Sequence, residues 1–214
     1  CTLGCMYLMR RGKMLPACLL GAYAAFTRSL GVVLIVPVVF ELVQRRAKLK
    51  DYLCVLIIPL GFAAYCLVNY TVSGDAFKFM QYQREHWNQQ LGWFFNTAAY
   101  QTENAIYSAS GNSVNFFGLW LPNLLAQALS LVLMLFAVKR LRSSYTAYFL
   151  AYFIVAVGAT WLLSAPRYLA AAFTVPTALA VITHDRRVDW CLTTLSVLAG
   201  AVYLCEFVLR WQVW

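Results

Sequence analysis

Two arginines lie where the sequence is otherwise apolar, and both could contact a phosphate. Arg28 interrupts the apolar stretch from Met14 to Val43, and Arg167 follows Pro166 between two later apolar stretches. An arginine inside a hydrophobic segment costs about 2.5–3.5 kcal/mol on insertion scales, so such residues often mark a function. A planar guanidinium can make two parallel hydrogen bonds to a phosphate. The alternative is that both side chains only anchor the chain in the headgroup layer, with Tyr168 in the aromatic belt.

A third group of polar and aromatic side chains lies in the long segment 73–115. The segment contains Arg84 and Glu85. His86 could act as an acid or base, and Trp87 or Trp93 could stack on a sugar ring. A lone polar histidine and an interfacial tryptophan are equally consistent with no catalytic role. The sequence has no Ser-His-Asp set, phosphate loop or zinc-protease motif, and its seven cysteines form no Cys-x-x-Cys pair. We therefore expect no metal site and no cofactor, and no residue is assigned as catalytic.

Composition indicates that membrane helices position these residues. Of the 214 residues, 62% are hydrophobic and 12% are charged, whereas a soluble domain is about 45–50% apolar and about 25% charged. The net charge of +9 gathers in short gaps between apolar stretches. This is the positive-inside pattern of membrane proteins, so nucleic acid is not an expected partner. The basic clusters are Arg10, Arg11 and Lys13; Arg45, Arg46, Lys48 and Lys50; Lys139, Arg140 and Arg142; and Arg186 and Arg187.

The apolar stretches predict an all-α, polytopic integral membrane protein. We expect a single membrane domain over residues 1–214, with about six transmembrane or half-membrane helices and an exoplasmic interfacial helix. Placing 45–50, 139–142 and 184–187 in the cytoplasm puts the 73–115 loop and Arg167 on the exoplasmic side. Apart from residues 14–43, the predicted helices are 52–72, 116–138, 145–163, 169–182 and 190–209.

Two segments need a closer interpretation. Residues 14–43 could form one tilted helix or a hairpin of two short helices that turns at Arg28. The hairpin is favoured, because the basic clusters at both ends of the segment then stay in the cytoplasm. In the loop, residues from about 76 to 92 predict a helix parallel to the membrane. The side chains expected to face inward are Phe77, Met80, Trp87 and Leu91.

Three segments carry a family resemblance. Residues 25–31 (AFTRSLG), followed by Pro37 and Glu41, are similar to a TRSNG…P…E segment. Residues 73–79 (SGDAFKF), with Gln83 and then His86 and Trp87, are similar to GDPLAF…Q…W, and residues 164–169 (SAPRYL) are similar to an S-x-PRY turn. In this order the segments resemble PIG-V-type mannosyltransferases of the GT-C glycosyltransferase superfamily, the second one resembling the bacterial members. Leu30 departs from the pattern, which often has asparagine there.

The resemblance implies a membrane glycosyltransferase. Such enzymes take a sugar, usually mannose, from a polyprenyl- or dolichyl-phosphate donor and transfer it with inversion. The acceptor is a glycolipid or glycan on the exoplasmic or lumenal side, and in eukaryotes it is a GPI-anchor intermediate. The family's catalytic acid lies in the first exoplasmic loop, N-terminal to the residues present here, so we expect the chain to be a fragment that lacks it. Substrate binding is expected at Arg28, Arg84, His86, Trp87, Arg167 and Tyr168.

Location and the competing function classes complete these expectations. The resemblance places the protein in the bacterial plasma membrane, or in the endoplasmic reticulum membrane if it is eukaryotic. Arg28, Arg167 and the loop around His86 and Trp87 are expected to converge on one exoplasmic cavity. A lipid or glycan transporter or flippase would also need cations near the membrane, and a non-catalytic membrane subunit is the third possibility.

Overall fold

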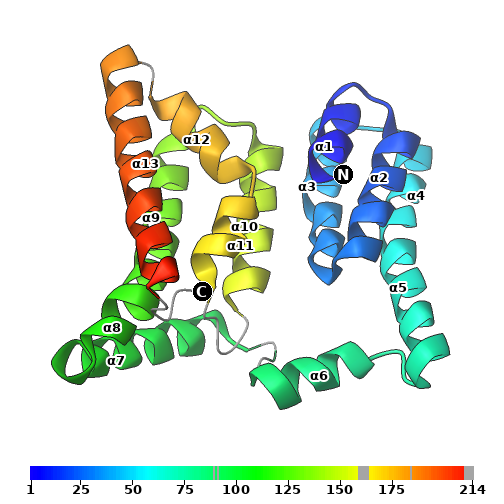
Figure 1. Cartoon of the computed structure of the whole chain (residues 1–214). Coiled ribbons are helices and arrows are strands. Elements are labelled where there is room, and N and C mark those ends of the chain that lie inside the picture. The colour runs from blue at the N-terminus through cyan, green and yellow to red at the C-terminus, as the bar shows by residue number, and fades with distance from the viewer. Residues whose placement is uncertain (89, 91, 159–163, 184, 210–214) are drawn as a thin grey trace. The chain divides into compact units, whose positions relative to one another are not determined.

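The chain folds into helices throughout the part that the structure describes. The computed structural model describes residues 1–88, 90, 92–158, 164–183 and 185–209 (Figure 1). These residues form two compact units. Unit 1 is Cys1–Gln90 with Arg142–Val155, and unit 2 is Leu91–Leu141 with Ala156–Trp214.

Three helices among the described residues are long and apolar enough to cross a membrane. The first is Leu49–Ser73, which comprises α4 (Leu49–Val55) and α5 (Ile57–Ser73). The second is Ser113–Ala137, which comprises α8 (Ser113–Asn115), η2 (Phe116–Trp120) and α9 (Leu121–Ala137). The third is α13 (Arg186–Val208). A fourth candidate is the bent pair of α11 (Ala165–Ala171) and α12 (Thr174–Ile182). The sequence predicted about six helices because that number also included shorter apolar helices, which are not long enough to count as spans. These are α2 (Met14–Thr27), η1 (Ser29–Leu34) with α3 (Ile35–Gln44), and α10 (Ser143–Val157), each of 10–17 residues.

The distribution of polar and apolar side chains on α9 is the reverse of that in a water-soluble protein. Its buried face carries Asn123 and Gln127, which are 1% and 6% exposed. Its outer face carries Leu129 and Leu135, which are 57% and 72% exposed. The window of α13 that qualifies as a span has no buried residue at all. This arrangement is what lipid solvation favours, because a bilayer accepts apolar side chains on the outside and polar groups find partners inside.

Residues 14–43 form the predicted hairpin. Helix α2 ends at Thr27, and Arg28 has an extended backbone, with φ −153° and ψ 128°. Helix α3 then returns to the level of α1 (Thr2–Arg10), where the Arg45 guanidinium donates to the carbonyl oxygens of Met9 and Arg10. Gly31 permits the tight turn, because a Cβ there would lie 2.4 Å from backbone atoms of α2. Both ends of the hairpin are therefore at the same end of unit 1.

The segment 73–115 contains two main helices where the sequence predicted one. Helix α6 (Lys78–Trp87) confirms a helix within the predicted residues 76–92, but it stops before Asn88, which has a left-handed backbone conformation. Its orientation relative to the membrane stays a prediction. Phe77 and Trp87 are each 55% exposed, so they do not pack into the protein, and whether they face the membrane stays a prediction. Helix α6 packs on α5 through Phe79, whose ring lies 5.1 Å from that of Tyr65. Leu91 lies outside the described residues.

The second helix of this segment, α7 (Phe94–Gly111), was not predicted. Its buried residues are mostly polar, so a search for apolar periodicity does not detect it. They are Thr97, Gln101, Ala105 and Ser108.

The predicted span 169–182 is interrupted by a bend and begins earlier than expected. Pro166 lies in the first turn of α11, so the helix begins before Arg167 instead of after it. The chain then bends by 72° between α11 and α12. The bend follows from Pro176, because a proline ring clashes with the carbonyl four residues earlier, here that of Ala172. Ala172 has ψ 97° and lies outside both helices.

Candidate functional site

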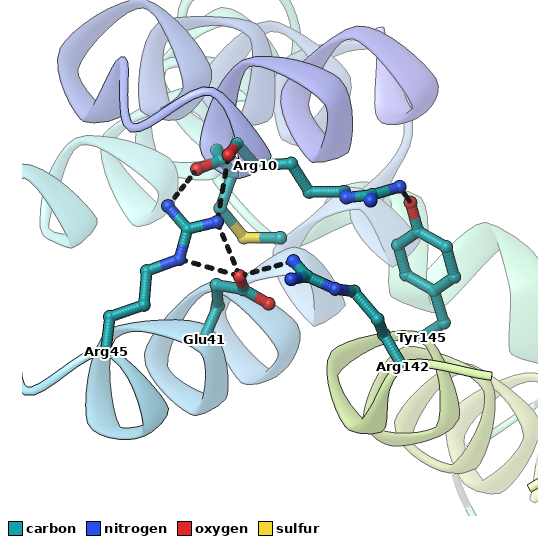
Figure 2. A network of polar contacts seen from close by, with 6 residues as sticks. Arg10, Glu41, Arg45, Arg142 and Tyr145 are labelled. Atoms are coloured by element: carbon teal, nitrogen blue, oxygen red, sulfur yellow. Dashed lines mark hydrogen bonds and ion pairs between the residues drawn. The ribbon is translucent and has the colours of Figure 1, made fainter. Parts of the chain in front are cut away.

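A buried carboxylate organises one end of unit 1. Glu41, near the end of α3, is 3% exposed. Its Oε1 accepts hydrogen bonds from Arg45 Nε at 2.8 Å and from Arg142 Nη1 at 3.0 Å. Arg10 Nη1 donates to the Tyr145 hydroxyl at 3.0 Å. Figure 2 shows the guanidinium groups of Arg45 and Arg142 on two sides of the carboxylate. We call Arg10, Glu41, Arg45, Arg142 and Tyr145 the arginine clasp.

The clasp lies at the end of unit 1 where residues of the basic clusters meet. It joins the C-termini of α1 and α3 to the first turns of α10, and α2 and α4 both begin just beyond it. Three of the four basic clusters contribute a residue, namely Arg10, Arg45 and Arg142. In unit 2, Arg140 Nη1 donates to the Val181 carbonyl at 3.2 Å, at the end of α12 that precedes the fourth cluster. By the positive-inside rule, these are the ends expected to face the cytoplasm.

Arg28 lies at the other end of unit 1. Helix α2 runs away from the clasp beside α5, and a Cβ on Gly61 of α5 would overlap the backbone of Ala22 (Figure 1). Arg28 follows the last residue of α2 and is exposed. Its N–H donates to Ala24 O at 3.0 Å, and its carbonyl accepts from Gly31 at 2.7 Å, so the break that presents the side chain is itself hydrogen-bonded.

Three further predicted residues belong to the same end of unit 1. Because α5 also runs away from the clasp, its C-terminus leads into α6 at the end opposite to the clasp (Figure 1). Arg84, His86 and Trp87 lie in the last turns of α6 and are exposed. The His86 ring is 5.6 Å from that of Tyr82. Unit 1 therefore places Arg28 and the α6 residues at a common end.

Arg167 and Tyr168 belong to unit 2. Both lie in the first turns of α11, where the Ala165 N–H donates to Asn123 Oδ1 of α9 at 2.9 Å. Arg167 is exposed, and its guanidinium carbon lies 5.6 Å from the centre of the Tyr168 ring. Because Arg28 and Arg167 are in different units, their convergence on one cavity stays a prediction.

Unit 2 has a polar interior that the sequence did not predict. Gln127 Nε2 donates to Gln101 Oε1 at 2.5 Å, which connects α9 to α7. Thr174, next to the bend between α11 and α12, is fully buried, and its hydroxyl has no hydrogen-bond partner among the described atoms. Near the end of α13, one carboxylate oxygen of Glu206 is also buried without a hydrogen-bond partner among the described atoms. The sequence signal for Glu206 was a single acid in the apolar stretch 190–209.

The described residues offer no group of three or more histidine, cysteine, aspartate or glutamate side chains that could hold a metal ion. Three comparisons, with protein families, with curated proteins and with solved structures, found no match for this chain.

Proposed function

We propose that the chain is part of a membrane glycosyltransferase of the GT-C kind, which moves a sugar, mannose in the first instance, from a polyprenyl- or dolichyl-phosphate donor to a glycolipid or glycan acceptor. The observation that supports this best is the position of Arg28. It is exposed at a hydrogen-bonded helix break, at the end of unit 1 that also carries α6 and lies opposite the clasp. Two of the three segments that resemble the mannosyltransferases thus contribute to one end of one unit.

The chemistry requires cations where a phosphate leaves. In the proposed reaction the acceptor hydroxyl attacks the anomeric carbon, and the bond from that carbon to the phosphate oxygen breaks. A general base takes the hydroxyl proton. The lipid phosphate departs with an additional negative charge, which Arg28 and Arg167 stabilise through guanidinium hydrogen bonds. Trp87 offers a ring surface to the sugar. We assign no base among the described residues.

The location follows from the same proposal. The Arg28 end of unit 1 faces the exoplasm or the lumen, and the donor lipid lies in the bilayer with its phosphate at headgroup depth. A chain of this kind belongs to the plasma membrane in bacteria, or to the endoplasmic reticulum in eukaryotes, where the acceptor would be a GPI-anchor intermediate.

Donor binding tests the proposal directly. A photoreactive polyprenyl-phosphate mannose would be crosslinked to the full chain in lipid vesicles, and the crosslinked fraction would be measured against probe concentration. We expect Arg28→Ala and Arg167→Ala each to weaken binding by about tenfold or more, because hydrogen bonds to charged groups contribute about 1.5–3 kcal/mol. Arg28→Lys should retain part of the affinity, since it keeps the charge but loses the two-pronged contact.

The control is Arg187→Ala, which removes an exposed cation from the last basic cluster. It should leave the crosslinked fraction within about twofold of the unmodified chain, as expected for an exposed surface charge to which the proposal gives no role in donor binding. Unchanged donor binding by both Arg28→Ala and Arg167→Ala would contradict the donor-site assignment.

A transporter of lipid-linked sugars is the second candidate, and the bent pair of α11 and α12 favours it. Broken helices beside polar interior groups are typical of transport sites. Unit 2 combines the 72° bend with the buried Thr174 hydroxyl. The same probe separates the two functions in sealed vesicles. A transferase releases polyprenyl phosphate, whereas a transporter moves the intact probe between the leaflets.

A further inference from the structure

The arginine clasp has three positively charged side chains and only one carboxylate, so it carries a net positive charge. The guanidinium groups of Arg45 and Arg142 share the single carboxylate of Glu41. The third guanidinium, that of Arg10, donates to the neutral Tyr145 hydroxyl. Each guanidinium offers five N–H donors, so the cluster can accept further anions. We propose that this end of unit 1 is a binding site for the phosphates of anionic phospholipids in the cytoplasmic leaflet.

The clasp is held in place before any lipid arrives. The Arg45 guanidinium donates to Glu41 and also to the carbonyl oxygens of Met9 and Arg10, at 3.1 and 2.9 Å. Arg142 donates one hydrogen bond to Glu41, while 49% of its side chain remains exposed. A fixed cation that is half-open to the headgroup layer binds a phosphate with little loss of side-chain freedom.

Exposed cations surround the clasp and extend its field. Among residues 1–90, the acidic residues at this end are Glu41 and Asp51. Cations strongly outnumber acids there, and the negative potential of a cytoplasmic leaflet attracts such clusters. The additional exposed cations are Arg11, Lys13, Arg46, Lys48 and Lys50.

Apolar side chains beside these cations identify a lipid as the ligand. Leu49, between Lys48 and Lys50, is 77% exposed, and Leu53 one turn further along α4 is 59% exposed. Val43, at the end of α3, is 60% exposed. Cations next to exposed apolar surface match a molecule with a phosphate and acyl chains. A free phosphate would use the cations alone, and a nucleic acid would leave the leucines in water.

Native mass spectrometry of the full chain in an uncharged detergent tests this proposal. The protein would be titrated with dioleoylphosphatidylglycerol, and with dioleoylphosphatidylcholine as the neutral reference, and the retained lipids would be counted. We expect retention of the anionic lipid over the neutral one. The exposed pair Arg46→Gln with Lys48→Gln should lower the anionic-lipid affinity by more than tenfold, because each basic residue near the surface contributes roughly fivefold.

The matched control removes the same charge elsewhere. Arg186→Gln with Arg187→Gln takes two exposed cations from the fourth basic cluster, in unit 2. This pair should lower the affinity less than threefold. Equal losses in both pairs would show that the charge acts diffusely and would overturn the site. Displacement of the anionic lipid by millimolar inorganic phosphate would identify a free-anion site and overturn the lipid assignment. Neither outcome depends on glycosyl transfer.

Discussion

Glu41 and Arg28 belong to the same hairpin but have opposite surroundings. Glu41 is buried and bound by two arginines, whereas Arg28 is exposed at a helix break. The sequence predicted the position of Arg28, because Thr27 and Ser29 interrupt the apolar stretch with it. It could also have suggested the contact of Glu41 with Arg45, which is four residues away and caps the same helix. The partner Arg142 is 101 residues away in the chain, and no local pattern reveals such a pairing.

Removing the Glu41 carboxylate should destabilise unit 1. In Glu41→Gln, two guanidinium groups lose their counter-charge, which costs several kcal/mol when both partners are buried and less than about 1 kcal/mol when both are exposed. The arginine side chains are 33% and 49% exposed, so the cost lies between these limits. We expect a loss of about 1–3 kcal/mol in the free energy of unfolding. Tryptophan fluorescence during unfolding in detergent would measure it.

The comparison variant is Glu103→Gln, an exposed carboxylate on α7. It should change the free energy of unfolding by less than about 0.5 kcal/mol. Adding Arg142→Gln to Glu41→Gln should cost less than Arg142→Gln alone, since the two side chains share one interaction. Additive losses would show that Glu41 and Arg142 do not stabilise each other.

At the scale of elements, the apolar stretches of the sequence located the long helices. They did not reveal a helix with a polar buried face or a bend within a span. The predicted spans 52–72, 116–138 and 190–209 lie within a few residues of helices long enough to cross a membrane. Helix α7 was missed because its buried face is polar. The bend between α11 and α12 could have been anticipated from Pro176, whereas the partner of each polar side chain depends on tertiary packing.

Gly61 sets the distance between α2 and α5. A Cβ at Gly61 would lie 1.9 Å from the Ala22 carbonyl oxygen, which belongs to the backbone and cannot rotate away. Gly61→Ala should therefore push the two helices apart and lower the free energy of unfolding by about 1–3 kcal/mol. Gly200→Ala in α13 is the control, because nothing lies within 4 Å of its added Cβ. It should be neutral or slightly stabilising, since alanine favours a helix by about 1 kcal/mol over glycine. Equal thermal midpoints for the two variants would contradict this packing.

At the scale of the whole molecule, the positive-inside rule predicts from the basic clusters which ends of the helices face the cytoplasm. Within unit 1 the clasp joins residues of three clusters, as the predicted topology requires. Within unit 2, Asn123 contacts the start of α11 and Arg140 contacts the end of α12, so α9 and α12 run in the same direction, again as predicted. The sequence could predict this pattern because the positions of basic residues set the direction in which each helix inserts. It could not predict the division into two units, which depends on contacts between distant segments.

The proposed donor site and the proposed lipid site require opposite ends of unit 1 to face opposite sides of the membrane. Cysteine labelling in intact cells tests this orientation most directly. The native cysteines would be replaced, and Lys48→Cys and Lys78→Cys would be introduced singly, since both lysines belong to unit 1 and precede or begin a helix. With a membrane-impermeant maleimide, we expect Lys78→Cys to be labelled from outside and Lys48→Cys to be labelled only after permeabilisation. Labelling of both variants from the same side, or the reverse pattern, would contradict the account.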